Sequence, residues 1–380
     1  MKKLSDPVIF PNGASIKNRF VQPPMLTNSG NQGEVTADTI QYYGARSDSA
    51  GMVTVEYAYV SENGGPAMTW APDHSQLAIF DDRFVPQLKK LAEAIKSHGN
   101  KAIIEIAHDG RQASGLADMG KSVYAPSEID YSFLPYPVKE LNDEQIKAII
   151  KDFGKATKRA IDAGFDGVLI HGANHYLLQQ FFSTISNKRD DHWGGSLEKR
   201  MNFPLAVVAE VLRVVKESAP NDFIVGYRFS PEEIHDTIGY TWHESTQLIK
   251  ALTDQFAIDY IDLSLPQYDQ KPIDSNQTFA EIFKPFIGNA KLGIVGNIRT
   301  ASDAQDALKY ADLLSVGRGS IADPNFARKV LEGHGDRIVD TITKDNMAAA
   351  HLTAGLQTIF ADAGHDLIPH WPKKRSSLWN

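Results

Sequence analysis

The chain has 380 residues, of which 42% are hydrophobic and 23% are charged, as in an ordinary globular protein. A formal net charge of −8 disfavours nucleic acid or an anionic membrane as a partner, so we expect a small-molecule substrate. The absence of cysteine excludes disulfides, thiolate zinc sites, iron–sulfur clusters and a cysteine nucleophile.

Neither a targeting signal nor a membrane span is expected. Lys2 and Lys3 could begin a signal peptide, but the polar Ser5 and Asp6 follow where its apolar core should lie. No stretch approaches the roughly 18 to 20 uninterrupted apolar residues of a transmembrane helix. The sequence therefore predicts a cytoplasmic protein without a membrane partner, and it leaves the oligomeric state open, a homo-oligomer included.

Short apolar runs, typical of strands, alternate with amphipathic helical patterns along most of the chain. The eight predicted strands cover residues 20–23, 52–60, 102–107, 167–171, 223–228, 260–264, 292–295 and 312–316. The clearest helical patterns lie at 84–97, 144–163, 205–217 and 244–255. Because the strands read as apolar runs and not as strict alternation, they predict a parallel sheet buried on both faces and closed into a β/α (TIM) barrel. We expect a single α/β domain over 1–380, with the barrel at about 18–335 and a C-terminal tail at 336–380.

Two segments fall outside this rhythm. Residues 8–16 surround an Asn12-Gly13 turn, which predicts a β-hairpin; its place before the first barrel strand makes it a lid on the closed end of the barrel. Residues 110–141 form the longest irregular segment and carry Tyr131, Phe133 and Tyr136. Such a segment is either a cover for an active site or a packed surface excursion.

The carboxyl ends of the predicted strands carry polar residues and glycines, and active sites of β/α barrels lie at these ends. In chain order, the residues at these ends are Pro23-Pro24-Met25, Glu56-Tyr57, Glu105, His171, Arg228, Ser264, Gly296-Asn297 and Gly317-Arg318. Charged side chains are costly at the end of a buried strand unless they have partners. Their convergence indicates a site, although structural ion pairs produce the same pattern.

The ends of the seventh and eighth strands indicate an anion site. Gly296 and Asn297 precede a predicted helix, and Gly317 and Arg318 follow the eighth strand. Glycine lets backbone N–H groups approach a phosphate, and arginine can bind it through two hydrogen bonds. These two loops are a common phosphate site in β/α barrels, so we expect a phosphate-bearing ligand here.

A stronger constellation follows the fourth strand, where His171, Asn174 and Tyr176 occur close together. In a helical turn, His171 and Asn174 would present two donors toward one oxygen, and the phenol of Tyr176 could donate a proton. This set suits a reaction that builds negative charge on a carbonyl oxygen and then protonates a neighbouring carbon. A buried structural histidine and a packing tyrosine remain the alternative.

The segment His171-x-x-Asn174-x-Tyr176 resembles the active-site motif of the old yellow enzyme family. Other segments similar to that family's motifs are Lys17-Asn18-Arg19, Pro23-Pro24-Met25, Ala107-His108, Gly110-Arg111, Ala125-Pro126-Ser127, Ser186-Asn187, Gly194-Gly195-Ser196, Arg228-Phe229-Ser230 and Val316-Gly317-Arg318. Each match is short, but the ordered set runs from the first predicted strand to the eighth. The resemblance therefore covers most of the chain.

The resemblance implies FMN bound across the open end of the barrel, with NADH or NADPH as its reductant. The residues that would contact FMN are Pro23, Pro24, Met25, Leu26, Tyr57, Glu105, His171, Arg228, Gly296, Asn297, Gly317 and Arg318. The phosphate would lie on the two glycine loops, where the anion site is predicted. Arg228 would face the N1–C2 carbonyl edge, where negative charge collects in the reduced flavin.

The resemblance also implies a ping-pong ene-reductase reaction. After NAD(P)H has reduced the flavin and left, an electron-poor alkene such as an enone or enal would enter the same pocket. His171 and Asn174 would hold its carbonyl oxygen, flavin N5 would deliver hydride to the β-carbon, and Tyr176 would protonate the α-carbon. Asn28 would lie on the substrate side. The cofactor carries the hydride chemistry, while the protein supplies position and charge.

The chain departs from the family at several flavin-facing positions. Glu105 stands where the family usually has glutamine, and an ionised glutamate accepts hydrogen bonds but donates none. We expect Glu105 to pair with Arg228 and make the flavin harder to reduce, or else to be buried in its neutral form. Leu26 stands where many relatives have threonine or cysteine, and Asn28 replaces a tyrosine of one bacterial branch. Tyr57 stands where relatives usually have a small residue beside the ring.

Other functions remain open. An NAD(P)H dehydrogenase or oxidase that reduces a quinone, free flavin or oxygen would use the same site, and an isomerase or hydrolase without a redox cofactor could use the same barrel. Glu56 and Glu105 could form a glycosidase pair, but that leaves the histidine, asparagine and tyrosine set unexplained. No metal is expected, because His171 and His175 lie four apart without a third ligand in view. The natural substrate and the choice between NADH and NADPH also stay open.

Overall fold

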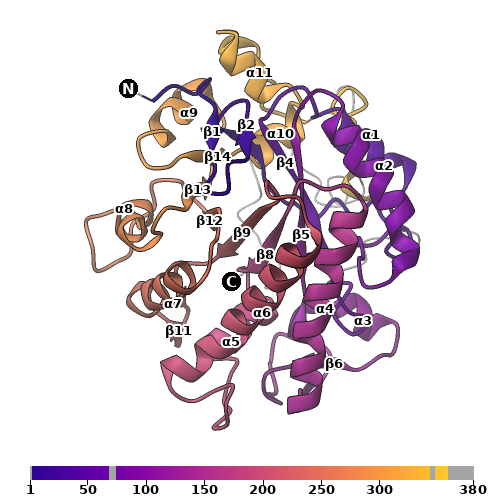
Figure 1. The fold of residues 1–380 in the computed structure, drawn as a ribbon, viewed down its shortest axis with the longest axis vertical. Helices are drawn as coiled ribbons and strands as arrows, with labels where there is room; N and C mark the ends of the chain where they lie inside the picture. Colours follow the sequence, from indigo (N-terminus) through magenta and orange to yellow (C-terminus); the bar gives the residue numbers. More distant parts are fainter. Residues whose placement is uncertain (1, 68–73, 343–346, 358–380) are drawn as a thin grey trace.

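The computed structural model describes residues 2–67, 74–342 and 347–357. Eight parallel strands close into a barrel in the order β12-β13-β14-β3-β4-β5-β8-β9, and Figure 1 shows helices around them. The barrel strands are β3 (Phe20–Gln22), β4 (Met52–Tyr59), β5 (Lys101–Ala107), β8 (Gly167–Gly172), β9 (Ile224–Phe229), β12 (Tyr260–Leu263), β13 (Lys291–Val295) and β14 (Leu313–Ser315). The predicted β/α barrel is therefore confirmed, and each strand lies where the sequence places it.

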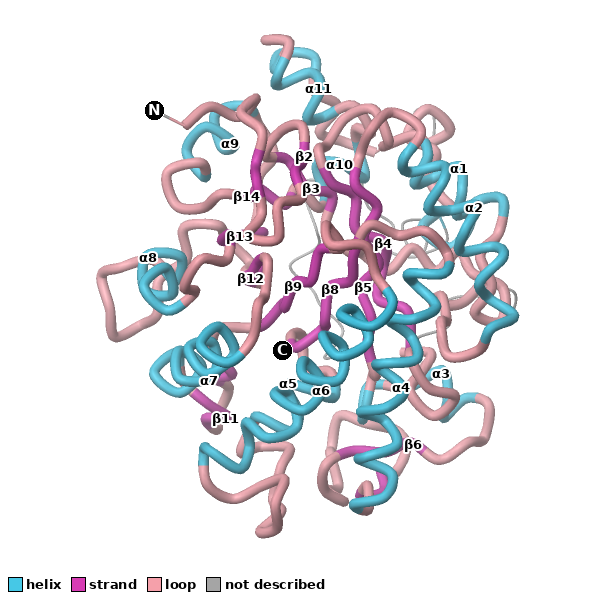
Figure 2. Tube along the Cα trace, viewed as in Figure 1, coloured by secondary structure: helices cyan, strands magenta, loops and turns pink. Residues whose placement is uncertain are grey.

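Helices cover the outside of the barrel, as the colours of Figure 2 make visible. They are α1 (Ala37–Gly44), α2 (Val85–Lys96), α3 (Ser114–Asp118), α4 (Asp143–Asp162), α5 (Leu177–Phe182), α6 (Leu197–Ser218), α7 (Trp242–Gln255), α8 (Phe279–Phe283), α9 (Ala301–Ala307), α10 (Arg318–Ala322) and α11 (Phe326–Leu331). The long helices bury one apolar face; α4, for example, buries Ile146, Ile149 and Phe153 at helical spacing. None of the helices in the described part is long and apolar enough to cross a membrane.

The strand register aligns the polar residues of three neighbouring strands. Every residue of β8 and β9 is buried, because helices cover their outer face and side chains fill the barrel interior. His171 of β8 pairs with Arg228 of β9, and Glu105 of β5 pairs with Leu169 of β8. Since strand residues alternate, Leu169 and His171 point to the same side. The register thus brings Glu105, His171 and Arg228 toward one end of the barrel.

An N-terminal hairpin closes the opposite end. It consists of β1 (Val8–Ile9) and β2 (Ser15–Ile16), which pair antiparallel, with Gly13 at φ +93° in the turn. Its buried side chains form one apolar cluster with residues at the beginnings of barrel strands, among them Met52 of β4 and Ile103 of β5. The predicted hairpin lid is therefore confirmed.

Two predicted segments differ from the structure. The helix predicted from residue 205 begins at Leu197, because Ser196 caps it by accepting a hydrogen bond from the Lys199 backbone N–H. Pro204 lies inside this helix, which tolerates the loss of one hydrogen bond, so a start directly after the proline is wrong. The segment at 110–141 is not irregular throughout, since it contains α3 and a parallel pair of β6 (Val123–Ala125) and β7 (Val138–Glu140) around an apolar cluster of its own.

A second hairpin follows β9 and has no counterpart among the predicted elements. It consists of β10 (Glu233–Ile234) and β11 (Ile238–Tyr240), paired antiparallel. Its exposed side chains include Ile234 and Ile238, so apolar residues in this sequence do not mark a buried strand face. Most of the predicted C-terminal tail, residues 343–346 and 358–380, lies outside the described residues.

Candidate active site

Three side chains from neighbouring strands meet at the carboxyl end of the barrel. Glu105 Oε1 lies 2.9 Å from His171 Nδ1, and Arg228 Nη1 donates to both Glu105 oxygens at 2.9 and 3.2 Å. The side chains of Glu105 and His171 are fully buried, and that of Arg228 is 8% exposed. The expected pair of Glu105 with Arg228 is therefore present, and His171 is an additional partner of the same carboxylate.

This arrangement fixes which nitrogen of His171 is left for a ligand. Because Arg228 stabilises Glu105 as an acceptor, the bonded Nδ1 of His171 carries a hydrogen, an inference from the hydrogen-bond network. Nε2 is buried and has no hydrogen-bond partner among the described residues. Burial lowers the pKa of His171, and the Glu105 carboxylate opposes this effect only in part. With Nδ1 bonded to Glu105, His171 can donate from Nε2 only as the imidazolium, the form that burial disfavours and Glu105 favours.

Two tyrosines complete the cluster around His171. The Tyr57 ring of β4 lies parallel to the imidazole, with 5.4 Å between centroids and 7° between planes. The Tyr176 hydroxyl donates to the Tyr57 hydroxyl at 3.0 Å, and the Tyr176 ring centroid lies 4.9 Å from that of His171. Burial raises the pKa of Tyr176 well above its usual value, so this phenol keeps its proton at neutral pH.

Asn174 lies at the site, but its backbone conformation and contacts differ from the predicted ones. It does not lie in a helical turn with His171, because its φ is +57° and α5 begins only at Leu177. Its side-chain oxygen accepts a hydrogen bond from Ser264 Oγ at 3.0 Å, and Arg228 Nη2 donates to the same hydroxyl at 3.4 Å. The amide nitrogen of the Asn174 side chain is thus the group it can offer to a ligand.

A cavity of about 260 Å³ extends from Arg228 to the two glycine loops. Its lining includes Pro23, Pro24, Met25, Arg228, Ser264, Gly296, Asn297, Gly317 and Arg318. Gly296 has a φ of +142°, and a Cβ there would lie 2.6 Å from the backbone of Gln267, so a side chain is not tolerated. Arg318 Nη2 donates to Asn297 Oδ1 at 3.2 Å. A cation and two glycine loops at one end and the Arg228 guanidinium at the other suit a long anionic ligand such as FMN.

Other predicted residues lie less directly at this site. Leu26 packs against the apolar cluster that contains Tyr57 and Tyr176. Asn28 is fully buried with φ +48°, and no contact in the described part of the chain joins it to His171 or Asn174, so its place on the substrate side stays a prediction.

The two carboxylates considered as a glycosidase pair have separate partners. Glu56 accepts hydrogen bonds from the Thr27 backbone N–H and, at 3.0 Å, from the Thr27 hydroxyl. Glu105 binds His171 and Arg228. Each carboxylate is therefore held by its own neighbours, and the hydrogen bonds do not join them as a catalytic pair.

The structure also shows partners of the site that were not predicted as site residues. The Asn174 backbone N–H donates to Ser230 Oγ at 3.0 Å, and His175 faces Glu233 and His235 of the β10–β11 hairpin. Ser230 follows the end of β9, so its position at a strand end was a usable signal. Glu233 and His235 carried no such signal in the sequence, because they lie 58 or more residues after His175 in a hairpin that was not predicted.

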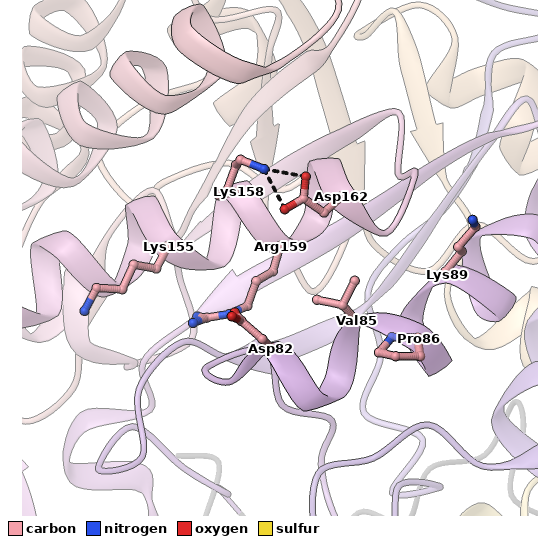
Figure 3. A pocket seen from close by; sticks show the side chains of 8 residues that line it. All are labelled: Asp82, Val85, Pro86, Lys89, Lys155, Lys158, Arg159 and Asp162. Carbon is pink, nitrogen blue, oxygen red and sulfur yellow. Dashed lines mark hydrogen bonds and ion pairs between the residues drawn. The ribbon is translucent and has the colours of Figure 1, made fainter.

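A separate groove of about 690 Å³ lies outside the barrel, and Figure 3 shows the eight side chains that line it. They come from α2, α4 and the short helical turn Asp82–Phe84 before α2. Lys158 pairs with Asp162 at 2.6 Å, and Arg159 Nε pairs with Asp82 at 2.7 Å. The groove is therefore a solvated surface with paired charges, and it shares no residue with the cavity at the strand ends.

Comparison with known proteins places the chain among flavin enzymes. The pattern of the NADH:flavin oxidoreductase / NADH oxidase family matches residues 3–337. The probable NADH-dependent flavin oxidoreductase YqiG of Bacillus subtilis (strain 168) is 39% identical, over 92% of this chain and 94% of that protein. The NADH:acrylate oxidoreductase of Vibrio harveyi is also 39% identical, but the chain, 87% of which is matched, covers only 33% of it.

Solved structures agree with this result. Morphinone reductase in complex with tetrahydroNAD has a TM-score of 0.74 and 27% identity, over 88% of this chain and 92% of that one. The old yellow enzyme homologue from Zymomonas mobilis has a TM-score of 0.74 and 25% identity, over 93% and 99%. An isomerase or hydrolase without a redox cofactor is thereby set aside. The chain belongs to the NADH:flavin oxidoreductase / NADH oxidase family, the old yellow enzyme family, and is an FMN-dependent oxidoreductase that uses NADH or NADPH as reductant.

Proposed function

We propose that the protein is an ene-reductase, which reduces the activated C=C bond of an α,β-unsaturated carbonyl compound at the expense of NAD(P)H. The observation that carries the proposal is the buried cluster in which His171 Nε2 lacks a hydrogen-bond partner and the Tyr176 ring lies beside it. Conjugate reduction needs a donor for the carbonyl oxygen and an acid for the neighbouring carbon. This cluster offers both groups side by side.

Each residue of the cluster has a definite task in this proposal. FMN, when bound, accepts hydride from NAD(P)H and transfers hydride to the substrate's β-carbon. In its imidazolium form, which Glu105 stabilises against the effect of burial, His171 donates from Nε2 to the carbonyl oxygen. The free amide nitrogen of Asn174 donates to the same oxygen, and Tyr176 gives its proton to the α-carbon. The added hydride and proton saturate the double bond.

Tyr57 restricts the size of the substrate in this proposal. Its ring lies parallel to His171 and its hydroxyl binds Tyr176, so it occupies space directly beside the donor and the acid. A side chain of this volume leaves room for compact enones and enals and excludes alkenes with bulky substituents.

A second candidate is an NAD(P)H dehydrogenase that passes electrons to a quinone, free flavin or oxygen. The observation that favours it is the partial coverage of two relatives: the chain covers 33% of the NADH:acrylate oxidoreductase of Vibrio harveyi and 36% of the NADH:fumarate oxidoreductase of Klebsiella pneumoniae (strain 342). The remainder of those proteins could hold the site where their acceptors are reduced. In that case, the matched part would serve only to oxidise NADH.

The variant Tyr176→Phe separates the two candidates. If Tyr176 protonates the α-carbon, reoxidation of the reduced enzyme by 2-cyclohexenone slows by about 10²-fold or more, whereas reduction by NAD(P)H is unchanged. Anaerobic stopped-flow spectroscopy measures the two half-reactions separately. Tyr124→Phe, a change on β6 outside the barrel, serves as the matched control. An unchanged rate of enone reduction in Tyr176→Phe would exclude Tyr176 as the acid.

A further inference from the structure

Three side chains with metal-binding atoms meet beside the loop that carries Asn174 and Tyr176. His175 comes from this loop, Glu233 lies on β10, and His235 follows in the turn of the β10–β11 hairpin. One ligand atom from each of the three lies within 4.8 Å of the other two. His175 Nδ1 is 3.5 Å from Glu233 Oε1, and the two imidazole centroids are 5.3 Å apart.

The Glu233 carboxylate has an oxygen left for a ligand. Its side chain is 1% exposed, and Oε2 accepts a hydrogen bond from Gln179 Nε2 at 3.1 Å. Oε1 is buried and has no hydrogen-bond partner among the described residues. Arg111 Nη2 lies 4.0 Å from Oε1, which is beyond hydrogen-bond distance. An orphaned carboxylate oxygen is costly in a buried position, and Oε1 lies 3.5 Å from His175 Nδ1, so it indicates a missing partner with positive charge beside this histidine.

The Glu233 carboxylate also has a cationic neighbour at a greater distance. Arg111 supplies part of the countercharge from a distance, and its guanidinium also stacks on the Tyr131 ring at 4.9 Å. A cation bound at Oε1 competes with this arginine, which limits its affinity.

The distances suit an ion with short bonds to nitrogen and oxygen. Bonds of about 2.0–2.2 Å place two ligands of a tetrahedral zinc ion roughly 3.3 Å apart. The separation of 3.5 Å between His175 Nδ1 and Glu233 Oε1 already matches this value. His235 is exposed and must move closer by a change of rotamer, which its place in a short hairpin turn permits. The fourth position would be open to water.

We propose that His175, Glu233 and His235 form a binding site for a divalent transition-metal ion of the zinc class. Two imidazoles and one carboxylate are ligands that zinc, nickel and cobalt share, and zinc binds such sets in an open tetrahedron. Gln179 supports two of the ligands, because its Oε1 accepts from the His175 backbone N–H at 2.8 Å and its Nε2 donates to Glu233. A bound ion ties the β10–β11 hairpin to the loop that carries Asn174 and Tyr176.

Zinc binding to the FMN-loaded, tag-free protein tests this proposal. Isothermal titration with ZnCl2 after removal of trace metal should show one ion per chain with a dissociation constant in the micromolar range or below. His235→Ala should weaken binding at least 10-fold; because His235 is exposed, the variant should fold. His334→Ala, which removes another exposed histidine, should bind as the wild type does. Absence of a saturable site in the wild type, or equal binding by His235→Ala, would overturn the proposal.

Hydrogen exchange locates the ion independently of its affinity. Zinc should slow amide exchange in the β10–β11 hairpin and in the loop after β8, because the ion joins them. The same experiment on Glu233→Gln should show no such protection. Protection confined to other parts of the chain would place the ion elsewhere and contradict the assignment.

Discussion

The Glu105 carboxylate binds two side chains on neighbouring strands, His171 of β8 and Arg228 of β9. A carboxylate beside this guanidinium cancels part of the positive charge that would otherwise stabilise electrons added to a flavin. The same carboxylate favours the imidazolium form of His171. We therefore expect Glu105, where the resemblance leads us to expect glutamine, to act on both the flavin and the substrate donor.

Replacing Glu105 with Gln should raise the two-electron midpoint potential of the bound FMN. The expected shift is on the order of tens of millivolts, since 30 mV corresponds to about 1.4 kcal/mol for two electrons. An anaerobic reductive titration against reference dyes measures the potential. Glu210→Gln, which removes a carboxylate that pairs with Lys151 and Arg213 on the outer helices, is the control. An unchanged potential in Glu105→Gln would show that this carboxylate does not tune the flavin.

Replacing Tyr57 with Ala should widen the range of substrates. Loss of the ring beside His171 makes room for β-substituted enones, so the ratio of kcat/KM for a bulky enone to that for 2-cyclohexenone should rise on the order of 10-fold. Steady-state kinetics with both substrates give this ratio. Tyr57→Phe keeps the volume and should leave the ratio unchanged. If Tyr57→Ala has the wild-type ratio, the ring does not limit substrate size.

At the scale of elements, the β1–β2 hairpin determines how the barrel interior is closed. Phe10 follows β1, is 2% exposed, and packs against Tyr260 of β12 with 6.0 Å between ring centroids. Its cluster includes the first residues of several barrel strands, so the hairpin supplies part of the core. The candidate active site lies at the opposite end of these strands, and its cluster of Glu105, His171 and Arg228 contains no hairpin side chain.

Replacing Phe10 with Ala should lower the free energy of unfolding by about 3–5 kcal/mol, because a buried aromatic ring leaves a cavity. Chemical denaturation followed by circular dichroism measures this change. Ile9→Ala, at the preceding position in β1, removes a side chain that is 62% exposed and should have little effect. The FMN content and kcat of the folded Phe10→Ala protein should match the wild type. Equal losses of stability in both variants would contradict the lid assignment.

The elements that could be predicted from the sequence are those with strong apolar periodicity. The sequences of β8 and β9 are continuous apolar runs, and that of α4 has a long amphipathic pattern, so the positions of these elements follow from the order of apolar residues. The β10–β11 hairpin could not be predicted, because strands of two and three residues with exposed isoleucines are too short to show the alternation of apolar and polar residues.

The site could be predicted as a set of strand ends but not as a hydrogen-bond network. The pairing of Glu105 with Arg228 follows from charge and strand order, and the structure contains it. The hydrogen bond between His171 and Glu105 depends on the directions of their side chains. The hydrogen bond from Ser264 to Asn174 also depends on the left-handed backbone at Asn174. Such local conformations are set by tertiary packing and leave no trace in residue spacing.

At the scale of the whole molecule, buried carboxyl groups make stability depend on pH. Glu56 is fully buried, and burial raises its pKa to about 7 although Thr27 donates hydrogen bonds to it. The folded protein thus binds this proton more tightly than the unfolded chain does. Its contribution to stability is fully present below about pH 4.5 and is lost as the pH rises through about 7.

Replacing Glu56 with Gln should remove this part of the pH dependence. The difference between the free energies of unfolding at pH 5 and pH 8 should change by up to about 3 kcal/mol, with the variant gaining relative stability at the higher pH. Denaturation curves at the two pH values measure it. Glu62→Gln, whose side chain is 74% exposed, should follow the wild type. A pH dependence identical in Glu56→Gln and wild type would show that Glu56 is not the group responsible.

We propose that the reduced enzyme returns its electrons to an activated alkene. The most direct measurement is an anaerobic visible spectrum of the FMN-loaded protein, recorded after one equivalent of NADH or NADPH and again after 2-cyclohexenone. An ene-reductase should lose its flavin absorption with the nicotinamide and regain it with the enone as fast as it turns over. A reduced protein that the enone leaves bleached, but that a quinone or oxygen reoxidises, would contradict the assignment as an ene-reductase.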